Sequence, residues 1–141
     1  MNIADIYDYL NSEEAIEYSK LSPESKLVED LGIEGDDFSE LIESFSKKYD
    51  IDMDSYLWYF HHREEGWNLG ALIFKPPYAQ VKTIPVTPEV LLAAAKTKVW
   101  PVKYPNHKLK PGRPDVLFNQ VLFGGIAIFG VVIWLFERNS T

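Results

Sequence analysis

Residues 27–54, LVEDLGIEGDDFSELIESFSKKYDIDMD, decide the fold of this chain. The apolar side chains of this stretch recur every three or four positions: Phe38, Leu41, Ile42, Phe45 and Tyr49. This spacing places all five on one face of an α-helix. We therefore predict an amphipathic helix that packs its apolar face into the core of a small helical domain.

The start of this helix is marked by acidic residues and glycines. With Asp37 as the N-cap, Glu40 falls at the third helical position, the carboxylate version of a capping box. Asp36 and Asp37 also lie where the helix macrodipole favours negative charge. Gly32 and Gly35 are expected to supply the backbone freedom that a tight turn before the helix requires.

Short motifs in this stretch carry a resemblance to a known fold: Asp30-Leu31-Gly32, Glu34-Gly35-Asp36, Glu40-Leu41 and Tyr49-Asp50. In this order they resemble the acyl carrier proteins, where Asp-Ser-Leu opens the second helix. The match puts Gly35 where those carriers have the serine that holds phosphopantetheine. Because glycine has no hydroxyl oxygen, the resemblance implies an acyl-carrier-protein-like bundle without this cofactor.

A second resemblance covers about the first hundred residues. Gly35-Asp36-Asp37 and the later stretch Thr87-Pro88-Glu89-Val90-Leu91-Leu92-Ala93-Ala94-Ala95, closing at Trp100, are similar to a family of small bacterial acyl-carrier-protein-like proteins of unknown function. Thr87 and Pro88 also form a strong helix start, as N-cap and first helical residue.

We predict a mainly α fold. Residues 1–100 form the acyl-carrier-like helical domain, and the spacing of Ile3, Ile6 and Leu10 indicates its first helix. Residues 69–74 and 81–84 are short apolar runs, which form either two small strands or an irregular insertion. Residues 101–115 are a basic linker that four prolines make stiff and extended.

Residues 116–136, from Val116 to Phe136, carry no charge, and only Asn119 and Gln120 are polar. At about 1.5 Å per residue this span matches a hydrocarbon core about 30 Å thick. We predict a single transmembrane helix, followed by a short tail at 137–141. The alternative is a helix buried in the domain, or exchanged between copies.

Four basic residues precede the span: Lys103, Lys108, Lys110 and Arg113. By the positive-inside rule they place the N-terminal domain in the cytoplasm. With the bacterial family, this predicts a single-pass protein of the bacterial inner membrane.

Charge is divided unequally along the chain. Residues 1–65 hold 18 acidic and 5 basic side chains, whereas residues 66–141 hold 3 acidic and 9 basic ones. An acidic front domain argues against nucleic acid as a partner. It suits docking of a basic-surfaced protein on the predicted helix, through Asp36, Asp37, Glu40 and Glu43, or is simply a solvated surface.

Other sites are weaker. The alternating acids from Asp50 to Asp54 lack the glycine and glutamate of a calcium loop, and His61 with Glu65 would need a third ligand. We therefore expect no metal site, no cofactor and no catalytic residues. The chain contains no cysteine.

The sequence thus favours a non-enzymatic, membrane-tethered, carrier-like binding module. One alternative is a working acyl or peptidyl carrier modified on another serine, Ser39 or Ser55. Another is a small membrane protein associated with immunity or toxin function.

Overall fold

In a computed structural model that describes residues 1–139, the central helix α2 spans Gly35–Tyr49. Its predicted apolar face is buried, with Phe38, Leu41, Ile42 and Phe45 no more than 3% exposed. The remaining elements are α1 (Ile3–Glu14), η1 (Tyr18–Lys20), η2 (Trp58–Phe60), η3 (Leu69–Leu72), η4 (Pro77–Ala79), α3 (Pro88–Thr97) and α4 (Pro114–Asn139). The fold is mainly helical, as predicted.

The start of α2 differs from the prediction. Asp37 is not the N-cap, because the Phe38 N–H already donates to the Glu34 carbonyl at 3.2 Å and closes a turn that begins earlier. Glu34 is the N-cap, and its side chain makes no capping hydrogen bond. Asp36 and Asp37 lie in the first helical turn, where their charge still opposes the macrodipole.

A capping box does occur, at the start of α1. The Asn2 side chain accepts hydrogen bonds from the Ala4 and Asp5 N–H groups, and the Asn2 N–H donates to the Asp5 carboxylate at 2.6 Å. The predicted start of α3 is confirmed, since the Thr87 hydroxyl accepts from the Val90 N–H at 3.3 Å. Both caps satisfy backbone N–H groups that a helix end leaves without partners.

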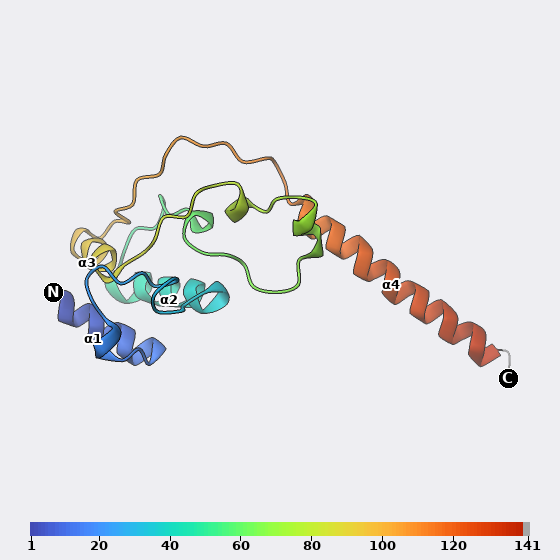
Figure 1. Cartoon of the computed structure of the whole chain (residues 1–141), viewed down its shortest axis with the longest axis horizontal. Helices are drawn as coiled ribbons and strands as arrows, with labels where there is room; N and C mark the ends of the chain where they lie inside the picture. The colour runs from blue at the N-terminus through green and yellow to red at the C-terminus, as the bar shows by residue number, and fades with distance from the viewer. Residues whose placement is uncertain (140–141) are drawn as a thin grey trace. The chain divides into compact units, whose positions relative to one another are not determined.

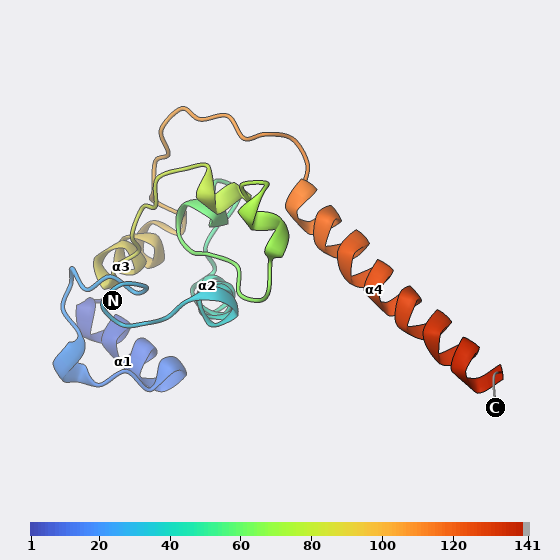
Figure 2. The same ribbon diagram turned by 45° about the vertical axis from the view of Figure 1, so that its right-hand side comes forward.

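The chain divides into two compact units. The first comprises residues 1–65 and 81–108, and contains α1, α2 and α3. Figures 1 and 2 both draw these three helices close together, joined by long loops. Their core is built from α1 residues such as Ile6 and Leu10, the buried face of α2, and Leu91 and Ala94 of α3.

The second unit comprises residues 66–80 and the chain from Leu109 onward. Residues 69–74 and 81–84 form no strands, and no sheet occurs among residues 1–139; only an isolated bridge joins Asp52 to Val99. The irregular alternative for this insertion is therefore the correct one. Pro76 and Pro77 interrupt the segment, and proline cannot donate to a strand ladder.

Helix α4 is the one helix of the described chain that is long and apolar enough to cross a membrane. Its most apolar window of 18 residues is entirely unburied, so in this structure it is not packed into a core. Its 26 residues correspond to about 39 Å at 1.5 Å per residue.

Candidate functional site

The four predicted docking residues all lie exposed on α2. Asp36, Glu40 and Glu43 follow one another at intervals of four and three positions, so they share one face of the helix. Within residues 1–139, neither Lys nor Arg forms an ion pair with Asp36, Asp37 or Glu40. Glu43 differs, because Lys47 one turn later pairs with its carboxylate and lowers its pKa.

Helix α1 adds to this negative charge at its last turn. Burial raises the pKa of the half-buried Glu14 carboxyl, and the charges of Asp37, Glu13 and Glu40 raise it further. A carboxyl that feels these charges lies in a region of negative potential. Two helices therefore build one acidic surface. It consists of Asp36, Asp37, Glu40 and Glu43 of α2 together with Glu13 and Glu14 of α1. Sequence reasoning missed the contribution of Glu14, because only folding brings the end of α1 beside the start of α2.

Gly35, which the expected resemblance to acyl carrier proteins would put at the position of their serine, has a backbone unsuited to a side chain. Its φ is +55°, in the left-handed region that glycine tolerates. A Cβ built on Gly35 would overlap the side chain of Glu65. That flexible carboxylate could move away, so the lasting obstacle to serine at this position is the backbone angle.

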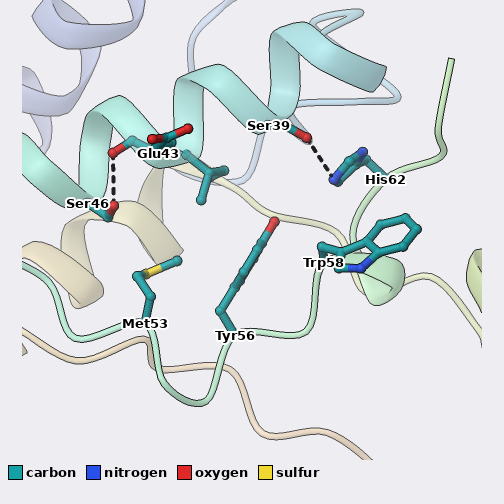
Figure 3. A pocket seen from close by; sticks show the side chains of 8 residues that line it. Ser39, Glu43, Ser46, Met53, Tyr56, Trp58 and His62 are labelled. Atoms are coloured by element: carbon teal, nitrogen blue, oxygen red, sulfur yellow. Dashed lines mark hydrogen bonds between the residues drawn. The ribbon is translucent and has the colours of Figure 1, made fainter.

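A pocket of about 220 Å³ opens beside α2 in the first unit. Figure 3 shows α2 side chains on one wall and the loop before and through η2 on the other. Its lining residues are Ser39, Ile42, Glu43, Ser46, Met53, Tyr56, Trp58 and His62. The Tyr56 ring projects between these walls with its hydroxyl toward α2 (Figure 3), and that buried oxygen has no hydrogen-bond partner among the described residues.

Ser39 and His62 meet at one end of this pocket. The Ser39 Oγ lies 3.3 Å from His62 Nε2, and His62 Nδ1 lies 3.0 Å from the Arg63 carbonyl oxygen. A carbonyl only accepts, so Nδ1 carries the proton; in the neutral ring Nε2 then accepts from the serine hydroxyl. Ser39 was named from the sequence as a candidate carrier serine, but its contact with His62 was missed because 23 residues separate the two.

His61 and Glu65, the possible metal pair, are not brought together. Residues 61–65 are not helical, so their spacing gives no shared face. His61 is instead buried at 1% exposure, with Nδ1 donating to the Ile84 carbonyl at 2.8 Å. No group of three or more His, Asp or Glu side chains within residues 1–139 is placed to hold a metal ion.

The other candidate serine, Ser55, directs its hydroxyl to the Trp100 carbonyl at 3.5 Å.

The Tyr104 hydroxyl joins two segments of the first unit, residues 57–61 and residues 100–104. It accepts hydrogen bonds from the Leu57 N–H at 3.1 Å and from the Trp100 indole N–H at 2.9 Å. Its own proton goes to His61 Nε2 at 2.7 Å, because His61 Nδ1 is already the donor to a carbonyl. This network holds the loop that forms one wall of the pocket.

Comparison with known proteins gives one family. The model of a family described as a protein of unknown function (DUF1493) matches residues 3–102. The chain belongs to this family. The matched region ends before α4, so the family domain contains the acidic surface, the pocket and the loop of residues 66–80. No solved structure matches the chain.

Proposed function

We propose that this DUF1493 protein is a non-enzymatic, carrier-like binding module, fastened to the bacterial inner membrane by α4 and facing the cytoplasm. The observation that carries the binding role is the acidic surface shared by α1 and α2, where burial and then the neighbouring charges of Asp37, Glu13 and Glu40 raise the pKa of Glu14. A surface of one charge sign attracts a partner of the other sign and speeds its encounter. The partner is accordingly a protein with a basic surface.

Carboxylates of α2 with and without a basic partner are expected to contribute differently to the docking of a basic protein. Glu40 has no basic partner among the described residues, whereas Glu43 is already neutralised in part by Lys47. A basic partner therefore gains more from Glu40 than from Glu43. The resemblance to acyl carrier proteins supports the same helix as the docking element. With Gly35 in place of the serine there is no hydroxyl to hold a prosthetic group, but the acidic face of the helix is still present.

The membrane tether is supported by α4 and by the residues before it. The apolar span from Val116 to Phe136 lies within the helix, and it carries no charge. Lys103, Lys108, Lys110 and Arg113 precede it and favour the cytoplasmic side. Basic residues at a membrane surface also attract anionic headgroups, by roughly 1 kcal/mol each.

The experiment is affinity capture of the full chain from detergent-solubilised membranes, with mass spectrometry of the co-purifying proteins. We expect Glu40→Lys to reduce partner recovery strongly and Glu43→Lys to reduce it less. Glu29→Lys is the matched control, because it makes the same charge change at an exposed position outside the acidic surface. Equal recovery with all three variants would refute docking through α2.

The second candidate is a carrier modified on Ser39, and the hydrogen bond to His62 favours it. A histidine that accepts the serine proton makes the oxygen more nucleophilic. Incubation with a phosphopantetheinyl transferase and coenzyme A, followed by intact-mass measurement, separates the two candidates. A mass increase in the natural chain that is absent in Ser39→Ala would establish the carrier and overturn the non-carrier proposal.

A further inference from the structure

The loop of residues 66–80, in the second unit, exposes large apolar side chains. Trp67 is 87% exposed, Leu72 84% and Ile73 62%. Leu69 and Phe74 are also more than a third exposed. Exposed apolar side chains grouped in this way mark interaction surfaces, since their burial is worth about 25 cal/mol per Å².

Hydrogen bonds of one asparagine, Asn68, connect this loop to the first turns of α4. The Asn68 side-chain amide donates to the Asp115 carboxylate at 2.9 Å, and its oxygen accepts from the Asn119 amide at 2.8 Å. The same oxygen accepts from the Ala71 N–H at 3.0 Å, which caps the turn η3. Asp115 is fully buried by these contacts and by its ion pair with Arg113 at 2.8 Å.

Gly70 allows the backbones of the loop and the helix to meet. Its N–H donates to the Asn119 side-chain oxygen at 2.8 Å. A Cβ at Gly70 would overlap the backbone carbonyl of Asp115, which cannot move aside as a side chain could. Figures 1 and 2 both draw η3 beside the start of α4. The loop is therefore part of the same compact unit as the base of α4.

The contacts with Asp115 and Asn119 place the loop beside the N-terminal end of the apolar span. Asp115 immediately precedes the span, and Asn119 lies one turn inside it. Polar groups near hydrocarbon require internal partners, and Asn119 finds them in Asn68 and the Gly70 N–H. A loop bonded at this level meets the boundary between headgroups and acyl chains, where tryptophan is enriched.

We propose that the loop of residues 66–80 is a second membrane-binding element, which places Trp67, Leu72 and Ile73 in the headgroup–acyl boundary of the bilayer beside α4. The proposal rests on the proposed membrane tether. Lys75 is exposed in the same loop and Lys110 just before α4, where both suit anionic headgroups. In this arrangement residues 66–80 lie against the membrane surface at the level of the first turns of α4.

The test uses the full chain, whose lack of cysteine permits single labelling sites without background. Three variants, Leu72→Cys, Ile128→Cys and Ser19→Cys, carry an environment-sensitive NBD fluorophore and are reconstituted into phosphatidylcholine–phosphatidylglycerol vesicles. Lipids brominated near the headgroup end of the acyl chain serve as quenchers, and aqueous iodide reports exposure to water. Ile128 lies in the middle of α4 and Ser19 is an exposed residue of the first unit.

We expect a blue-shifted emission at Leu72→Cys, quenched by brominated lipid and protected from iodide, with Ser19→Cys showing the opposite behaviour. Protection of Ile128→Cys from iodide reports that α4 is in the bilayer. If Ile128→Cys is protected but Leu72→Cys is quenched only by iodide, the loop proposal is wrong and the tether stands. Protection of Leu72→Cys from both quenchers would place this side chain in a contact within the chain or between its copies, the only protein in these vesicles, and would overturn the proposal. Iodide quenching at Ile128→Cys would overturn the tether together with the loop.

Discussion

The Asn119 side-chain amide donates a hydrogen bond of 2.8 Å to the side-chain oxygen of Asn68. Asn119 is one of two polar residues in the apolar span, and Asn68 belongs to a loop that precedes it by 51 positions. The contact gives a polar group at the end of an apolar helix a partner within the protein. It also explains why the loop and the base of α4 form one unit.

Asn68→Ala removes the partners of Asp115, Ala71 and Asn119 in one substitution. Leaving buried polar groups unpaired costs about 1–3 kcal/mol. We expect the backbone amides of residues 70 and 71 to exchange with solvent roughly 10 to 100 times faster, which hydrogen exchange with mass spectrometry measures. Asn106→Ala, an exposed change in the linker, should leave the exchange unaltered. Unchanged protection in Asn68→Ala would show that the asparagine does not hold the loop.

Tyr104→Phe should destabilise the first unit by more than the loss of one hydroxyl suggests. The single oxygen serves Leu57, Trp100 and His61, so its removal leaves three polar atoms without this partner. We expect a loss of at least about 2 kcal/mol in the free energy of unfolding, measured by denaturant titration of the full chain in detergent. The matched control is Tyr59→Phe, whose hydroxyl contacts an exposed histidine. Equal effects of the two variants would contradict the network.

His61 predicts a loss of stability in weak acid. Burial lowers the pKa of His61 from 6.5 to about 4, against the raising effect of its hydrogen bond to the Ile84 carbonyl. Protonation would turn Nε2 into a donor facing the Tyr104 oxygen, which already accepts two hydrogen bonds. His61 in the unfolded chain binds a proton more readily than His61 in the fold. The contribution of the neutral ring to the free energy of unfolding is therefore fully present above about pH 6.5 and is lost as the pH falls towards 4. The full loss is roughly 3 kcal/mol.

Nuclear magnetic resonance of the His61 ring checks this directly. We expect its chemical shifts to stay constant from neutral pH until near pH 4. The pH dependence of unfolding should also be shallower in His61→Gln than in the natural chain. A midpoint near 6.5 for His61 would show that the ring is not buried as described.

Gly35→Ser would introduce a hydroxyl at the first residue of α2, but the backbone angle at this position opposes a side chain. A residue with a Cβ at a φ of +55° costs about 1–2 kcal/mol relative to glycine. Glu65→Ala removes the overlap with the new side chain, so the double variant isolates the cost of the angle. We expect Glu65→Ala to recover only a small part of the stability lost in Gly35→Ser, as measured by chemical denaturation. Full recovery would show that the overlap, not the angle, is the obstacle.

The local elements were predictable because their signals are local. The apolar spacing from Phe38 to Tyr49 and the Thr87-Pro88 start describe α2 and α3 without knowledge of the rest of the fold. The start of α2 was misplaced because several acids precede it, and the backbone hydrogen bond from Phe38 to Glu34 decides among them. The insertion at residues 66–80 has no periodicity, so its conformation depends on hydrogen bonds to a distant helix.

The acidic residues of α2 could be named from the sequence, whereas the acidic residue that α1 adds beside them could not. Glu43 has Lys47 on the same helix, yet the contribution of Glu14 requires α1 to approach α2. The Ser39–His62 contact and the Tyr104 network were not predicted, because each joins residues more than 20 positions apart. The pocket was not predicted either, because its second wall is a loop without periodicity.

The sequence by itself determined that the fold is mainly helical, where α2 and α3 lie, and that one long helix is apolar enough for a membrane, since these follow from residue type and spacing. Only the tertiary structure decided which polar atoms find partners. Asn68 with Asn119, Ser39 with His62 and Tyr104 with His61 are hydrogen-bonded because the fold brings residues that are distant in the sequence within reach of one another. A hydrogen bond depends on distance and direction in space, and chain spacing does not supply either across a loop.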